Sequence, residues 1–165
     1  MIAYTTIETK IGTLFLASSK KGICKIGLPG EKTSTNLDWL KSHFPDDKII
    51  EDKKYLSNLS GELKQYFDGQ LKKFESPIDL QISPFRKKAL LAVSEIPCGR
   101  TASYKEIAEK INNPKAGRAV GSANANNPIP ILIPCHRVIA HNGSMGGYGG
   151  GLIMKRKLLE LEGAI

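Results

Sequence analysis

Short apolar runs separated by turn-forming residues fill the first 28 residues of the chain. Residues 2–7, 13–17 and 23–28 are rich in β-branched and aromatic side chains, and glycine-containing turns lie between them. This alternation predicts a small antiparallel sheet built from consecutive strands. After these strands, residues 34–44 and 53–67 are predicted to be helical. In the second segment, the apolar residues Leu56, Leu59, Leu63 and Phe67 fall on one face of the helix.

A change of pattern near residue 80 divides the chain. Residues 68–84 are rich in turn formers, which is typical of a connector. We therefore expect an α+β protein with an N-terminal α/β supporting domain over residues 1–80 and a mainly helical domain over residues 81–165.

The second half predicts several short helices. One helix can begin at residues 83–84, and another follows the Ser-x-x-Glu capping box of residues 103–106 and ends near Lys110. A break at residues 112–114 precedes a third helix over about residues 115–123. Two short helices around a tight turn form a helix-turn-helix pattern.

The third of these helices carries almost no long side chains. Most of its residues are small: Ala116, Gly117, Ala119, Gly121, Ala123 and Ala125. A helix that reads base edges in the major groove of DNA usually carries Arg, Asn or Gln. A smooth face suits either a close approach to a narrow groove or close packing against a neighbouring helix, and the pattern leaves both open.

The charge is distributed unevenly. Residues 1–80 contain 12 Lys and Arg against 11 Asp and Glu, whereas residues 81–165 contain 12 against 5, so the second half carries nearly all of the net charge of +8. This excess favours a polyanionic partner such as nucleic acid. No apolar run is long enough to span a bilayer, and the N-terminus lacks a signal-peptide pattern. We expect a cytoplasmic protein without a membrane partner, nucleoid-associated if the source is prokaryotic.

One of the three cysteines stands out. A sparse, odd set of cysteines does not indicate a disulfide framework, and neither the cysteines nor the three histidines have zinc-ligand spacing, so we expect no metal. Cys135 is different because prolines stiffen the segment that delivers it beside His136. His136 and Arg137 are expected to give the thiol an electropositive setting that favours the thiolate.

Cys135 and His136 can cooperate only if the backbone bends or a water joins them, because adjacent residues of a strand point to opposite faces. The imidazole also needs a partner that fixes its tautomer. The pattern does not choose among the five carboxylates of this half: Glu95, Glu106, Glu109, Glu160 and Glu162.

The run NPIPILIPCHRV at residues 127–138 resembles the active-site signature of the O6-alkylguanine-DNA alkyltransferases. Four further segments occur at the family's spacing: Ser103-Tyr104, NPKAGRAVG at residues 113–121, YGGGL at 148–152 and LEG at 161–163. The resemblance implies an RNase H-like N-terminal domain and a winged-helix-like C-terminal domain. It also implies DNA repair by single, irreversible transfer of an alkyl group from O6 of guanine, and from O4 of thymine, to the protein.

The resemblance implies a role for each residue of the reaction. Cys135 would be the acceptor nucleophile, His136 would deprotonate it through a water, and Glu162 would orient His136. Tyr104 would donate a proton to the leaving guanine, and Asn127 would stabilise the turn before the cysteine. No cofactor is implied, because a displacement at carbon needs only a thiolate and a proton donor.

Further residues are implied for the DNA and the pocket. Arg118 would fill the space left by the flipped nucleotide, and the other DNA contacts would come from Tyr104, Lys115, Ala116, Gly117, Ser122 and Ala123. The pocket would be lined by Pro130, Val138, Met145, Tyr148 and Gly149, with the Val138 carbonyl and the Gly149 N–H recognising guanine edges. Asn124 and Gly149 differ from residues that are common in relatives, and both are expected to widen the pocket. The partner would be double-stranded DNA containing O6-alkylguanine, bound by a monomer.

Two other functions use the same residues. A cysteine hydrolase would employ the Cys135–His136 pair with repeated turnover, and it would need an oxyanion hole. A helix-turn-helix regulator would bind a specific DNA sequence without chemistry at the cysteine. Stoichiometric methylation of the chain by alkylated DNA distinguishes the alkyltransferase from both.

Overall fold

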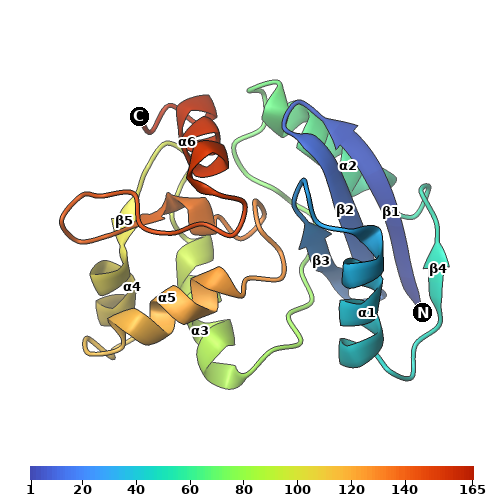
Figure 1. The fold of residues 1–165 in the computed structure, drawn as a ribbon, viewed down its shortest axis with the longest axis horizontal. Coiled ribbons are helices and arrows are strands. Elements are labelled where there is room, and N and C mark those ends of the chain that lie inside the picture. Colours follow the sequence, from blue (N-terminus) through green and yellow to red (C-terminus); the bar gives the residue numbers. More distant parts are fainter. The chain divides into compact units, whose positions relative to one another are not determined.

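The computed structural model describes all of residues 1–165, and they form two compact units, Met1–Gln81 and Ile82–Ile165 (Figure 1). Each unit buries its own set of apolar side chains. The first combines a sheet with helices and the second is mainly helical, so the predicted α+β class is confirmed.

The sheet of the N-terminal unit has the strand order β3-β2-β1-β4. β1 (Ile2–Thr9), β2 (Gly12–Ser19) and β3 (Gly22–Gly27) are antiparallel neighbours, as the alternation predicted. β4 (Ile49–Glu51), a strand that was not predicted, pairs parallel with β1. The chain passes through α1 (Thr33–His43) between β3 and β4, and a helical crossover returns it in the same direction. A strand of three residues is too short to show the alternation of apolar and polar residues by which strands are predicted.

The N-terminal core lies against both faces of this sheet. The last six residues of β2 are all buried, as expected of a central strand. Leu40 of α1 packs with Ile2, Phe15 and Cys24 in one cluster. The helix α2 (Ser57–Phe67) contacts β1. It begins four residues later than the predicted start at residue 53, because the preceding segment forms a turn.

The C-terminal unit packs four α-helices around one core: α3 (Pro84–Ser94), α4 (Tyr104–Lys110), α5 (Gly117–Ala125) and α6 (Leu152–Leu161). The two-residue strands β5 (Ala102–Ser103) and β6 (Val138–Ile139) pair in parallel. The Ser103 hydroxyl accepts a hydrogen bond from the Glu106 backbone N–H at 3.0 Å, which caps α4. α4 and α5 contact each other and α3, forming the predicted helix-turn-helix.

Candidate active site

The backbone bends at Cys135. The residues Cys135–Arg137 form one turn of 3-10 helix, so Cys135 and His136 do not alternate as strand residues would. The segment before them is held by Asn127, whose Nδ2 donates to the Ile133 carbonyl at 2.9 Å and whose Oδ1 accepts from the Ile129 N–H at 3.0 Å. Asn127 therefore ties the end of α5 to the cysteine segment, where the resemblance puts it.

The same segment contains a strained residue. Ile131 has a φ of 76°, and a β-branched side chain is rarely found in this region. Its side chain is buried and the Ile133 N–H donates to the Ile129 carbonyl across the turn at 2.9 Å. The surrounding packing and hydrogen bonds therefore impose the path that brings the cysteine into the site.

A buried carboxylate holds the imidazole. His136 Nε2 and Glu162 Oε2 are 2.8 Å apart, with side chains 0% and 1% exposed. The other four candidate carboxylates are exposed, so Glu162 alone meets the histidine. Burial lowers the pKa of His136 despite the opposing effect of Glu162. The imidazole is therefore neutral at pH 7, with its proton assigned to Nε2 by this bond, and Nδ1 is left as the basic nitrogen.

Arg137 supports the carboxylate and not the thiol. Its Nε donates to Glu162 Oε1 at 2.9 Å, and its guanidinium also donates to Glu162 Oε2 at 2.8 Å and to the Ile96 carbonyl at 2.6 Å. The expectation that Arg137 favours the thiolate is wrong, because its side chain extends to Glu162.

The cation that acts on the thiol is a lysine that the sequence patterns did not single out. Burial raises the pKa of Cys135, and a hydrogen bond from Asn127 and the charge of Lys155 oppose that rise. Lys155 is 0% exposed, and its Nζ donates to the Val138 carbonyl at 2.6 Å and to the Gly147 carbonyl at 3.1 Å. Burial lowers its pKa to about 8. The helical spacing of Lys155 with Leu158 and Leu159 could have indicated that this lysine is buried, because all three lie on the inward face of α6.

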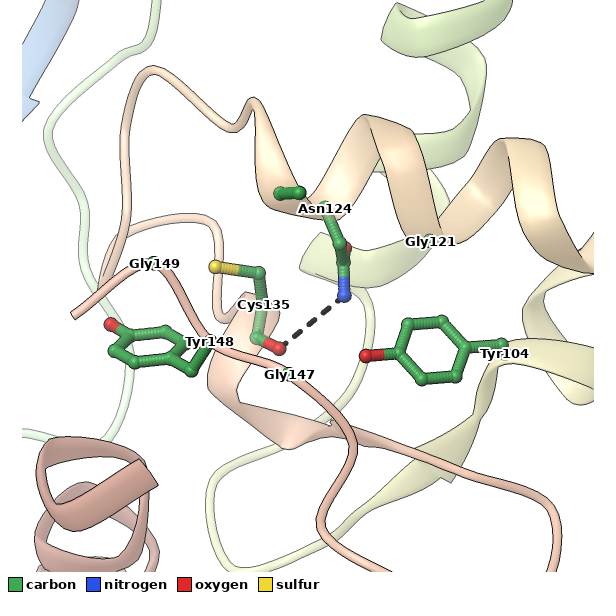
Figure 2. Close-up of a pocket in the computed structure, with 8 residues that line it drawn as sticks. Tyr104, Gly121, Asn124, Cys135, Gly147, Tyr148 and Gly149 are labelled. Carbon is green, nitrogen blue, oxygen red and sulfur yellow. Dashed lines mark hydrogen bonds between the residues drawn. The ribbon is translucent and has the colours of Figure 1, made fainter. Parts of the chain in front are cut away.

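Cys135 opens into a pocket of about 210 Å³ (Figure 2). Its lining comes from four parts of the unit: Tyr104, then Gly121, Asn124 and Ala125 of α5, then Cys135, and Gly147, Tyr148 and Gly149 of the glycine-rich loop. The Tyr104 hydroxyl points toward Asn124 and Cys135 in Figure 2. Gly146 has a φ of 67°, and a Cβ there would lie 2.9 Å from the Tyr104 hydroxyl, so the loop approaches the tyrosine more closely than other residues allow.

The pocket includes only part of the predicted lining. Tyr148 and Gly149 belong to it, whereas Pro130 and Val138 are buried outside it and Met145 is half-buried outside it. The Val138 carbonyl, expected to meet guanine, already accepts from Lys155. Gly121, Ala125 and Gly147 line the pocket without having been predicted, because small residues carry no chemical signal in the sequence.

The outer face of α5 lies beside this pocket. Lys115, Arg118 and Ser122 are exposed, and Gly117 is half-buried. Ala116 and Ala123 are buried, so their side chains pack inward and are not available for the predicted DNA contacts. A groove of about 360 Å³ follows this face, lined by Tyr104, Lys105, Pro114, Gly117, Arg118, Gly121 and His141. Close packing against neighbouring helices, one of the two interpretations of the small-residue helix, therefore applies to its inner face.

The structure contains no group of three or more His, Cys, Asp or Glu that could hold a metal ion. None of its helices is long and apolar enough to cross a membrane.

Comparisons with known proteins agree over nearly the whole chain. Residues 2–80 match the family "6-O-methylguanine DNA methyltransferase, ribonuclease-like domain", and residues 84–164 match "6-O-methylguanine DNA methyltransferase, DNA binding domain". The chain is 43% identical over 160 residues to the methylated-DNA–protein-cysteine methyltransferase of Methanosarcina mazei, covering 96% of each chain. It is 40% identical over 159 residues to the inducible methylated-DNA–protein-cysteine methyltransferase of Bacillus subtilis, covering 96% of this chain and 89% of the relative.

The fold agrees with a solved structure that contains DNA. The crystal structure of Mycobacterium tuberculosis OGT in complex with DNA superposes with a TM-score of 0.86 at 38% identity, covering 98% of this chain and 93% of that one. Family matches to both units and relatives at 40% identity or more lead to one conclusion: this chain belongs to the 6-O-methylguanine DNA methyltransferase family.

Proposed function

We propose that this protein repairs DNA by moving an alkyl group from O6 of guanine onto Cys135, once per molecule. One observation carries the proposal: the thiol that opens into the pocket directly precedes a buried histidine held by a buried carboxylate. Family membership supports the reaction, and the geometry supports Cys135 as the residue that performs it.

The transfer begins with deprotonation of the thiol. His136 is neutral and has Nδ1 as its basic nitrogen, so it takes the proton of Cys135 through a bridging water. Glu162 stabilises the imidazolium that forms. Glu162 also meets Arg137, whose charge compensates the buried carboxylate.

The thiolate then attacks the alkyl carbon. The S–C bond forms as the C–O6 bond breaks, and the bonding pair remains on the guanine, which takes a proton from the Tyr104 hydroxyl. A hydrogen bond from the Gly147 backbone to Tyr104 stabilises its oxygen as the proton leaves. Overall, the thiol proton replaces the alkyl group on the base and Cys135 becomes a thioether, which no neighbouring residue is suited to cleave.

The base must leave the duplex to reach this pocket. The exposed Arg118 is the side chain of α5 that can occupy the vacated stack, and Lys115 and Ser122 can contact the backbone. The predicted contacts of Ala116 and Gly117 would then come from their backbone. The C-terminal unit thus binds DNA, and the N-terminal unit has a supporting role. The protein acts as a monomer in the cytoplasm.

The two other functions are not favoured. A cysteine hydrolase and a non-catalytic regulator both conflict with relatives that are named, over nearly the full chain, as methyltransferases whose acceptor is a protein cysteine.

The test is Cys135→Ser, with intact mass measured after incubation with duplex DNA containing O6-methylguanine. The unmodified chain should gain one methyl group, mapped to Cys135, and the variant should gain none while still binding DNA, because affinity comes from phosphate contacts. Cys98→Ser is the control and should react normally. Cys24 should stay unmodified, because burial raises its pKa to about 12. A methyl group on Cys24 or Cys98, or on the Cys135→Ser variant, contradicts the proposal.

A further inference from the structure

One histidine of the C-terminal unit takes no part in the alkyl transfer. His141 is exposed and lines the groove of about 360 Å³ that follows the outer face of α5, together with Lys105 and Arg118. Its imidazole makes no hydrogen bond within the protein, so both ring nitrogens are free to meet a ligand. The groove therefore presents one titratable side chain beside two permanent cations.

A tight turn fixes the position of this histidine. The Gly143 N–H donates to the Ala140 carbonyl at 2.9 Å, and the Ala140 N–H donates to the Ser144 carbonyl at 3.0 Å. The Ser144 N–H donates to Asn142 Oδ1 at 3.0 Å, and Gly143 has a φ of 85°, which favours glycine. The turn directly follows β6, which is paired with β5. His141 is therefore held at the groove by the turn and the strand pair.

The charged groups that line the groove are all cationic. Lys105 comes from α4 and Arg118 from α5, and no carboxylate belongs to the lining. The acidic residues of α4, Glu106 and Glu109, lie outside it. Tyr104 stays neutral near pH 7, because burial raises the pKa of its hydroxyl. A groove with this lining fits a phosphate of a nucleic-acid backbone.

The arrival of a phosphate changes which form of His141 is favoured. Histidine is the side chain that ordinarily gains or loses its charge between about pH 5 and 8. Beside Lys105 and Arg118 alone, a third positive charge is repelled. A phosphate in the groove reverses this effect, because the anion attracts the protonated ring and accepts a hydrogen bond from one of its N–H groups.

We infer that His141 takes up a proton when DNA binds and then holds a backbone phosphate together with Lys105. The inference rests on the proposed function and adds a proton to its DNA-binding step: the neutral protein site, one proton and DNA give a complex that contains an imidazolium. By linkage, the affinity gained from this contact is fully present at low pH and is lost as the pH rises and the imidazolium loses its proton.

The experiment measures the affinity for an undamaged DNA duplex at pH 6 and at pH 8, at constant ionic strength, by fluorescence anisotropy. Undamaged DNA leaves Cys135 unreacted, so only binding is observed. The unmodified chain should bind about tenfold more weakly at pH 8, which corresponds to a difference of one pKa unit between free and bound imidazole. His141→Gln should bind equally at both pH values, with the weaker affinity. His141→Lys keeps a cation and should bind equally at both with the tighter affinity.

The salt dependence of binding gives a second readout. Each further phosphate neutralised by a cation steepens the slope of log affinity against log salt by about 0.9. The slope of the unmodified chain should be steeper by about this amount at pH 6 than at pH 8, because His141 is then charged in the complex. His141→Gln should show the shallower slope at both pH values, which a merely structural role of this side chain would not produce.

His43→Gln is the matched control, because His43 is also an exposed histidine but lies in the N-terminal unit. It should retain the pH dependence of the unmodified chain. Affinity of the unmodified chain that is equal at both pH values, or a pH dependence that persists in His141→Gln, overturns the inference. Either result leaves alkyl transfer to Cys135 intact, whereas failure of the unmodified chain to bind duplex DNA at either pH overturns the proposed function as well.

Discussion

The reactivity of Cys135 is a balance between burial and one neighbouring charge. Burial raises the pKa of the thiol, and the ammonium of Lys155 acts in the opposite direction. The thiol is therefore mostly protonated at pH 7, and the thiolate fraction increases about tenfold for each pH unit up to its pKa. Lys155 also ties the Gly147 carbonyl of the pocket loop to the Val138 carbonyl of β6.

Lys155→Met should slow transfer most below about pH 8, where Lys155 carries its charge. Removing the ammonium removes a factor that lowers the thiol pKa, so that pKa rises further and the rate at pH 7 falls, by about tenfold if the change is one unit. The measurement is the rate of transfer from free O6-benzylguanine between pH 6 and 9.

Lys157→Met on the same helix is the matched control, because Lys157 is exposed. A uniform loss of rate at every pH in Lys155→Met would show that Lys155 only holds the loop. Rates that approach those of the unmodified chain above about pH 8, where Lys155 itself loses its charge, support the electrostatic role.

At the scale of secondary structure, α5 has two faces with different functions. Val120 and Ala123 pack into the core, where α5 contacts α3 and α4. Arg118 projects from the other face into the groove that also contains Tyr104 and His141. The helix thus joins a face packed in the core to an exposed face beside a groove.

Arg118→Ala should slow repair of duplex DNA much more than reaction with free O6-benzylguanine. The free base needs no flipping, whereas a flipped nucleotide leaves a gap that costs a few kcal/mol of stacking. Loss of the arginine should therefore lower the duplex rate by roughly tenfold or more. The readout is the ratio of the two rates, and Arg156→Ala on α6 is the control because Arg156 is also exposed. Equal slowing on both substrates means that Arg118 acts in the chemistry or the fold.

At the scale of the molecule, the site lies entirely within the C-terminal unit. Cys135, His136, Glu162 and the pocket all belong to Ile82–Ile165. A change at Cys135 can therefore reach α5 through Asn124 and Asn127, which both bond to the cysteine segment.

Alkylation of Cys135 should lower the melting temperature of the protein. The added group occupies a site in which the thiol is already buried, and overfilling a packed region costs about 1–3 kcal/mol. We expect a decrease of several degrees, measured by calorimetry on one preparation before and after stoichiometric methylation.

Cys135→Ser treated with the same alkylated DNA is the control and should melt unchanged. An equal or higher melting temperature after methylation of the unmodified chain argues against this destabilisation. Product in excess of one equivalent per chain contradicts the single transfer.

The sequence by itself determined the features that depend on local interactions. The alternating runs of residues 2–28 specify three antiparallel strands, and the Ser103–Glu106 capping box specifies the start of α4, because both depend on neighbours in the chain. The motif around Cys135 identified the family for the same reason: its identity and spacing lie within a few residues.

Only the tertiary structure decided which distant groups meet. Glu162 is 26 residues from His136, and four other carboxylates were equal candidates until packing buried this one. Arg137 is the cation near the cysteine in sequence, but it bonds to Glu162, and the fold instead brings the charge of the distant Lys155 to act on the thiol. The parallel pairing of β4 with β1 also depends on how the chain folds back in three dimensions. The same is true of the glycines that line the pocket, Gly121 and Gly147. Electrostatic interactions and packing depend on distances in space, and burial strengthens the electrostatic interactions. Side chains of the same type therefore acquire different roles.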